Sequence, residues 1–276
     1  MKIIHISDIH LTVPGEEMGG HDPHARFDRA LRHILADHAD AARIVITGDL
    51  AHWGEPAAYA ALRDALQGLP IPVRLMIGNH DNRANFRAVF ADHPTDENGF
   101  VNHAETIDGT RFLYLDSTGE RTHAGHFCAA RRNWLATELA GCDRARLFLH
   151  HNPMLLGLPA EDRIALVPED RPGFAALLAE YGAKIDYLHF GHVHAPIHGC
   201  YQGVQFASVP STGNQSIPDL AEPRYLKSAA LSPAYCVVLI EGGSTIIHQV
   251  PFDWDGPVTL SGTGWDDWAK PHEAAE

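Results

Sequence analysis

The chain has 276 residues and a formal net charge of −14, from 21 lysines and arginines against 35 aspartates and glutamates. Its 45% hydrophobic residues can bury a core, which excludes global disorder, and its length predicts one large domain or one domain with an appendage. The acid excess argues against a protein that grips long nucleic acid through a basic face. The 20 histidines, almost as many as the 21 lysines and arginines, are the unusual feature of the composition. They draw attention because histidine is the commonest metal ligand.

The N-terminal residues and the cysteines point to a cytoplasmic protein. The apolar run near the N-terminus is too short for a signal peptide, and no stretch approaches the about 18 apolar residues of a membrane span. We therefore expect no integral membrane association. Four cysteines lie far apart with no C-x-x-C pair, so we expect reduced and mostly buried thiols: Cys128, Cys142, Cys200 and Cys236.

The first 90 residues alternate strands with helices. Strands are predicted at 2–7, 43–47 and 73–77, and helices at 24–38, 55–66 and 83–91. This alternation is typical of a parallel sheet covered by helices.

The pattern changes in the second half. A hairpin with an Asp108-Gly109 turn is predicted first, then helices at 129–140 and 173–181, and strands at 145–149, 186–190, 197–200 and 204–208. An irregular segment, 209–234, precedes a final hairpin at 235–250. We expect an α/β fold, a layered sandwich whose sheets become mixed in this half, with a core at 1–208 and a C-terminal extension at 209–276.

Polar clusters follow five predicted strands. They are Asp8-Ile9-His10, Gly48-Asp49, Gly78-Asn79-His80-Asp81, His150-His151 and Gly191-His192-Val193-His194. Open α/β sheets bind ligands beyond the carboxyl ends of their strands, so the five clusters should converge. Imidazole and carboxylate without thiolate suit zinc, iron, manganese or cobalt. The ligands suffice for two ions, divalent or trivalent, and Asp49 is the best candidate to bridge them because it lies between the two sets in sequence.

These motifs, in this order, resemble the calcineurin-like metallophosphoesterase family, and most closely its bacterial cyclic-nucleotide and glycerophosphodiester phosphodiesterase branch. Local support comes from Asp116-Ser117 and from the residues 231–234 before the last hairpin. The resemblance implies a four-layer α/β/β/α sandwich with two mixed sheets and a dinuclear metal site. His52 stands where the purple acid phosphatase branch has a tyrosine, which disfavours that branch.

The resemblance also implies the ligands. One metal would be held by Asp8, His10, Asp49 and His194, and the second by Asp49, Asn79, His150 and His192. His80 would face the phosphate and the leaving-group oxygen, as a charge stabiliser or proton donor. Taken singly, Asp8 could be a turn residue and Asn79 a helix cap, but the five clusters together favour the metal site.

The implied activity is hydrolysis of small phosphodiesters, cyclic nucleotides or glycerophosphodiesters, by metal-activated hydroxide. The alternatives are a phospholipid head-group phosphodiesterase and a broad phosphomonoesterase. A nuclease is disfavoured by the charge, and a non-catalytic interaction module is disfavoured because every ligand is present. Similar enzymes suggest a homo-oligomer, a dimer or larger.

Further residues are candidates for the pocket. They are His52, Trp53, His151, Asn214, Gln215 and Arg224. For His52 and Trp53 a packing role is about equally favoured, and for His151 we favour support of the site or packing. His5 and His189 lie within strands and are expected to be hydrogen-bonded in the core. The tail with Trp254, Trp265 and Trp268 would pack on a sheet edge or form a subunit interface.

Overall fold

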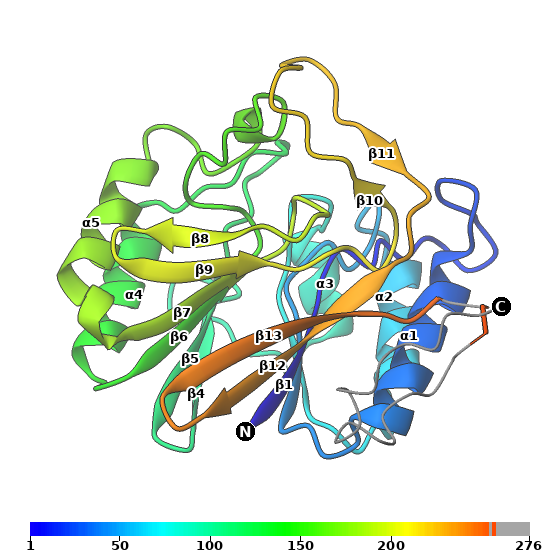
Figure 1. Ribbon diagram of the computed structural model, residues 1–276, viewed down its shortest axis with the longest axis horizontal. Helices are drawn as coiled ribbons and strands as arrows, with labels where there is room; N and C mark the ends of the chain where they lie inside the picture. Colours follow the sequence, from blue (N-terminus) through cyan, green and yellow to red (C-terminus); the bar gives the residue numbers. More distant parts are fainter. Residues whose placement is uncertain (254–255, 258–276) are drawn as a thin grey trace, which may run out of the picture.

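The computed structural model describes residues 1–253 and 256–257, and in these residues two β-sheets face each other with helices on both outer sides (Figure 1). The first sheet has the strand order β13-β12-β1-β2-β3. Its strands are β1 (Lys2–Ile6), β2 (Arg43–Ile46), β3 (Val73–Leu75), β12 (Ala234–Glu241) and β13 (Ser244–Pro251). The three N-terminal strands are parallel, and β12 and β13 are antiparallel to their neighbours, so this sheet is mixed.

The second sheet has the order β4-β5-β6-β7-β9-β8 and is also mixed. Its strands are β4 (His103–Ile107), β5 (Thr110–Leu115), β6 (Ala145–Leu149), β7 (Ile185–Phe190), β8 (His198–Tyr201) and β9 (Val204–Ser208). The four central strands β5, β6, β7 and β9 are parallel, and the two outer strands are antiparallel. The predicted α/β sandwich with two mixed sheets is therefore confirmed.

The helices begin at sequence signals that are easy to recognise. The helices are α1 (Pro23–Asp37), α2 (Pro56–Leu66), α3 (Arg83–Val89), α4 (Ala129–Ala140) and α5 (Arg171–Tyr181), with short 3₁₀ turns η1 (Glu161–Arg163) and η2 (Gly182–Lys184). Asp22 caps α1 by accepting from two backbone N–H groups, and Asn82 caps α3 in the same way through one. Proline stands in the first turn of α1, α2 and α5, where its missing N–H costs nothing.

Strand β1 is buried on both faces, and its alternate side chains enter two different cores. Ile3 joins the core formed with the second sheet, α4 and α5, whereas Ile4 and Ile6 join the core under the first three helices. The same division holds for β2, where Val45 faces the second sheet and Ile44 faces the helices. Because β1 and β2 pack on both sides, their centres are short continuous apolar runs, Ile3-Ile4 and Ile44-Val45-Ile46.

The carboxyl ends of both sheets meet at one place. The backbone N–H of Asp8 donates to the Gly48 carbonyl, so the segments after β1 and β2 are joined. The N–H of Gly191, after β7, donates to the carbonyl of His150, after β6. The N–H of His192 donates to the Asp8 carboxylate at 3.0 Å, which ties the second sheet to the first.

Several details differ from the sequence expectation. Strand β3 ends at Leu75, and the segment 209–234 contains two short paired strands, β10 (Gln215–Ser216) and β11 (Ser228–Ala229). After residue 208 the chain also returns to the first sheet, where β12 pairs with β1. Of the four free cysteines only Cys236 is buried, so the expectation of mostly buried thiols was wrong. The tryptophan-containing tail lies outside the described residues. Among the described helices none is long and apolar enough to cross a bilayer.

The interior between the sheets contains hydrogen-bonded histidines, as the sequence predicted. His5 contacts the Thr47 hydroxyl at 2.9 Å, and His189 contacts the guanidinium of the buried Arg146 at 3.0 Å. The ring of Phe148 stacks on His189 with centroids 4.7 Å apart and meets the edge of His5 at 5.8 Å. Phe148 is thus the apolar contact that joins the two sheets around these polar groups.

We expect Phe148→Ala to lower the free energy of unfolding by about 3–5 kcal/mol, because it leaves a cavity between the sheets. Denaturant unfolding measures the change. The control is Ile246→Ala on β13. Because this residue is 52% exposed, its truncation to alanine should lower the free energy of unfolding by less than about 1 kcal/mol. Similarly small losses of stability in both variants would contradict the packing of Phe148 between the two sheets.

Candidate metal centre

Four side chains from three strand ends bring their donor atoms together. Asp8, His10, Asp49 and His194 each offer one ligand atom, and these atoms lie within 4.8 Å of one another. His10 Nε2 lies 3.2 Å from His194 Nε2, which in turn lies 3.3 Å from Asp8 Oδ1. These are the residues that the sequence assigned to one metal.

A second group lies beside the first and shares its carboxylate. His150 and His192 converge with His151 within the same 4.8 Å limit. His150 Nε2 lies 3.0 Å from Asn79 Oδ1 and 3.4 Å from Asp49 Oδ2. The same Asp49 Oδ2 lies 3.7 Å from His10 Nε2, so one oxygen atom stands between the two groups.

Hydrogen bonds to backbone carbonyls determine which nitrogen of two rings faces this centre. His150 Nδ1 lies 2.9 Å from the Thr47 carbonyl, and His194 Nδ1 lies 2.8 Å from the Asn214 carbonyl. A carbonyl can only accept, so each Nδ1 carries the hydrogen and each neutral ring presents a bare Nε2 inward. This arrangement, with the outer nitrogen anchored, is the usual one for metal-binding histidines.

The residues fit a metal ion by a geometric test. Two donor atoms each about 2.1 Å from one ion lie about 3.0–3.4 Å apart at tetrahedral or octahedral angles. Most separations measured here, from 3.0 to 3.4 Å, fall in that range. Asp8 Oδ1 and His192 Nε2 are buried and have no hydrogen-bond partner among the residues that the structure describes. Lone pairs that face one another in a buried site need a cation to be stable.

The electrostatics of the centre also favour positive charge. Burial lowers the pKa of His150, but the carboxylates of Asp49 and Asp8 outweigh this effect and raise it to about 9. The pKa of His194 is likewise raised, because Asp8 overcomes the effect of burial. Burial alone would raise the pKa of Asp49, yet the nearby imidazoles hold it well below its usual value. Carboxylates here stay ionised and attract a proton or a metal ion.

The backbone is strained at five of the candidate ligands. Asp8, His10, Asp49, His192 and His194 have φ of 55°, 46°, 49°, 69° and 48°, in the left-handed region that non-glycine residues rarely adopt. Such strain is characteristic of functional sites.

Gly191 permits the close approach of the two sheets at this point. A Cβ added to Gly191 would lie 1.9 Å from Ser7 Oγ and 2.8 Å from Asp8 Oδ2. A side chain here would therefore displace the end of β1 and the carboxylate of Asp8.

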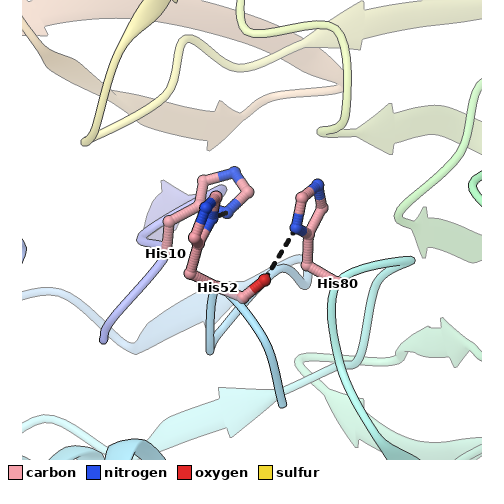
Figure 2. A group of neighbouring side chains, drawn as sticks. All are labelled: His10, His52 and His80. Carbon is pink, nitrogen blue, oxygen red and sulfur yellow. Dashed lines mark hydrogen bonds between the residues drawn. The ribbon is translucent and has the colours of Figure 1, made fainter. Parts of the chain in front are cut away.

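The centre opens into a cavity of about 340 Å³, whose lining includes three neighbouring imidazoles, His10, His52 and His80 (Figure 2). His80 Nδ1 lies 2.8 Å from the His52 carbonyl, so Nδ1 carries hydrogen and Nε2 is left for another partner. The rings of His52 and His80 stack with centroids 5.1 Å apart. The predicted catalytic residue His80 thus lies beside the candidate ligands.

Of the six candidate pocket residues, two line the cavity and four have other contacts. His52 and Asn214 line the cavity. Trp53 is 69% exposed and contacts His52. His151 is buried, and its ring nitrogens contact Ser117 Oγ and the His123 carbonyl. Gln215 is buried and donates to the Ser211 carbonyl, and Arg224 is exposed and paired with Glu222. Neither of the last two lines the cavity.

Two further residues, Asp81 and His123, organise the site although sequence reasoning assigned them no role. Asp81 accepts from the backbone N–H groups of Leu50, Ala51 and Gly78 and from the Tyr59 hydroxyl, so it holds together the segments after β2 and β3. Its place in the Gly-Asn-His-Asp cluster was the available signal. His123 lines the cavity and its Nδ1 lies 2.9 Å from Asn79 Nδ2. No sequence pattern around His123 indicated this position.

Sequence comparison finds a matching family and named relatives. Residues 1–196 match the family described as calcineurin-like phosphoesterase. The chain is 35% identical over 263 residues to a probable cyclic nucleotide phosphodiesterase of Rhodopseudomonas palustris, with 94% of this chain and 95% of that protein covered. It is 28% identical over 224 residues to the glycerophosphodiester phosphodiesterase GpdQ of Enterobacter lignolyticus, with 78% of each covered.

Structural comparison supports the fold. A purple acid phosphatase from yellow lupin seeds superposes with a TM-score of 0.62 at 16% identity, over 94% of this chain and 52% of that one. At this identity the likeness concerns the arrangement of sheets and helices.

We expect Gly191→Ala to reduce bound metal and to lower hydrolysis of bis(p-nitrophenyl) phosphate by about 100-fold, because the added methyl displaces Asp8. Elemental analysis of the purified protein and initial rates measure the two effects. The matched control is Gly141→Ala at the end of α4, where an added Cβ approaches no atom closer than 3.5 Å. Full metal content in Gly191→Ala would contradict the close contact of Gly191 with Ser7 and Asp8.

We also expect metal binding to release protons near pH 7, because His150, with a pKa of about 9, must lose its proton to bind. The apparent affinity should therefore rise with pH and level off above about pH 9. Calorimetric titration with Zn²⁺ or Mn²⁺ in buffers of different ionisation enthalpy counts the protons. Binding without proton release would show that His150 does not contact the ion.

Proposed function

The chain belongs to the calcineurin-like phosphoesterase family, and from this premise we propose that it is a dinuclear metal-dependent phosphodiesterase acting on small phosphodiesters. Cyclic nucleotides are the first candidate substrates and glycerophosphodiesters the second, in keeping with the names of its relatives. A cavity of about 340 Å³ suits a small ligand, since small-molecule sites typically measure about 300–1,000 Å³.

The observation that carries the proposal is the position of Asp49 Oδ2. This oxygen lies 3.7 Å from His10 Nε2 and 3.4 Å from His150 Nε2, between two groups of donor atoms. A carboxylate in that position can bridge two ions. We assign Asp8, His10, Asp49 and His194 to one ion, and Asp49, Asn79, His150 and His192 to the other. Zinc, iron, manganese and cobalt all suit this donor set.

The ions, when bound, would supply hydroxide at neutral pH by lowering the pKa of water to about 7, and would neutralise charge on the phosphate. The chain's own residues hold the carboxylates in place, because the N–H groups of His192 and His80 donate to Asp8 and Asp49. His80 Nδ1 keeps its hydrogen on the His52 carbonyl, so donation from Nε2 requires the imidazolium, which carries hydrogen on both nitrogens. We assign this form to protonate the leaving oxygen, a step that leaves the ring neutral.

We expect Asp49→Asn and His150→Ala to lose hydrolysis of 3′,5′-cyclic AMP, glycerophosphoethanolamine and bis(p-nitrophenyl) phosphate by more than about 100-fold. That exceeds the 10- to 100-fold typical of residues that only support a metal ligand. Both variants should also hold less metal, measured by elemental analysis.

The control is His248→Ala, which removes an exposed imidazole on β13. It should keep full activity and metal content. Undiminished hydrolysis by metal-free Asp49→Asn protein would overturn the proposed mechanism, and hydrolysis of phosphomonoesters but of no diester would overturn the proposed substrate class.

A further inference from the structure

Glu161 is a carboxylate in the cavity for which neither the metal centre nor the proposed chemistry has a use. It lies in η1, within the long loop between β6 and α5, and lines the same cavity as His10 and His80. Its side chain is 7% exposed. No group of converging donor atoms in the described residues includes it, so the metal centre does not use this carboxylate.

The surroundings of Glu161 do not compensate its charge. Within the described residues no lysine, arginine or histidine forms an ion pair with it, and the Ser216 hydroxyl is its side-chain hydrogen-bond partner. Burial raises its pKa to about 7, against the opposing effect of His194. A buried carboxylate without a cation is unfavourable for folding, and such groups gather at functional sites.

The cavity wall around Glu161 differs from the wall around His80. His10, His52, His80 and His123 form a continuous set of neighbouring rings. Glu161, Ser216 and Leu226 are neighbours that also line a smaller adjoining hollow, and Ile164 belongs to the same cavity. Besides the imidazoles, the cavity lining therefore offers apolar side chains, hydroxyl groups and the Glu161 carboxylate. The part of the lining around Glu161 suits the organic group of a diester, with apolar contact beside a carboxylate that can accept a hydrogen bond.

Resting on the proposed phosphodiesterase function, we propose that Glu161 is a specificity-determining residue that accepts a hydrogen bond from a hydroxyl or ammonium group on the organic part of the substrate. Such a donor would add a hydrogen bond from the substrate to the one that the Ser216 hydroxyl makes with this carboxylate. Because Glu161 is not a ligand, its effect should be confined to substrates that carry a donor.

The experiment compares Glu161→Gln and Glu161→Leu with the wild type on matched diesters. Bis(p-nitrophenyl) phosphate carries no hydroxyl or ammonium group that could donate a hydrogen bond to Glu161. The hydroxyl arm pairs 3′,5′-cyclic AMP with its 2′-deoxy analogue. The ammonium arm pairs glycerophosphoethanolamine with glycerophosphocholine, which carries the same glycerol hydroxyls but a quaternary nitrogen without hydrogen, so the difference between the two reports the ammonium hydrogens alone. Metal content is measured for every variant, and Glu169→Gln, an exposed glutamate of the same loop, is the control.

In Glu161→Leu we expect kcat/KM to fall about 10- to 100-fold, mainly through KM, for the diester whose donor Glu161 binds. Bis(p-nitrophenyl) phosphate should change less than about twofold, and metal content should not change. Glu161→Gln, which keeps an acceptor oxygen without charge, should largely restore a hydroxyl-bearing substrate but not an ammonium-bearing one, so the two arms identify the donor.

Three results would overturn the inference. These are an equal loss on every diester, a loss of metal in the Glu161 variants, and a wild type that hydrolyses bis(p-nitrophenyl) phosphate but none of the donor-bearing diesters. A wild type that is inactive on all diesters with metal bound would instead refute the proposed function, so the two failures can be told apart.

Discussion

The carboxylate of Asp49 lies where the carboxyl ends of both sheets meet, and side chains from each sheet converge on it. Its Oδ1 accepts from the backbone N–H of His80, after β3. Its Oδ2 faces His10 from the first sheet and His150 from the second. Because a buried anion must be neutralised by what surrounds it, the packing of the two sheets and the charge of the centre depend on each other. Any shift of one sheet relative to the other would separate these donors.

The convergence of these side chains requires strained backbone conformations. Five candidate ligands follow their strands in the left-handed conformation, which costs of order 1–3 kcal/mol for a non-glycine residue. These sharp turns at the strand ends place Asp8 and His10, which are two residues apart, in one centre with Asp49 and His194. The strained turns persist because the strands before them are buried on both faces and cannot shift.

The cavity is lined by two chemically distinct groups of side chains that come from different parts of the chain. One group consists of imidazoles from the segments after β1, β2 and β3, together with His123. The other group includes Glu161, Ser216 and Leu226 and comes from the loop before α5 and from the segment that contains β10 and β11. Figure 1 shows this last segment, with β10 and β11, projecting beyond the two sheets. The second group lies on connecting segments, which tolerate change most readily.

Much of the fold was predictable because its signals are local. Strand and helix periodicity, the caps at Asp22 and Asn82, and the glycines at strand ends are properties of a few neighbouring residues. The short pairing of β10 with β11 was not predictable, because residues 215 and 229 meet only once the loop between them has folded over the site. The candidate ligands were found because each follows a recognisable strand. Arg224 and Gln215 were selected by sequence proximity alone, and the structure directs their side chains to Glu222 and Ser211.

The sequence by itself determined which polar residues stand at the ends of buried strands, and therefore which residues converge on one centre. The reason is that side-chain alternation and strand termination depend on the local chain. Only the tertiary structure decided that Asp49 Oδ2 lies between two imidazole groups and that His123 approaches Asn79. It also decided that Glu161 enters the cavity, where none of the described residues forms an ion pair with it. These contacts join residues that are far apart in the sequence. His10 and Asp49 are 39 positions apart, Asn79 and His123 are 44 apart, and Asp49 and His150 are 101 apart. Such distances are set by how two sheets pack and loops close, which no local pattern encodes.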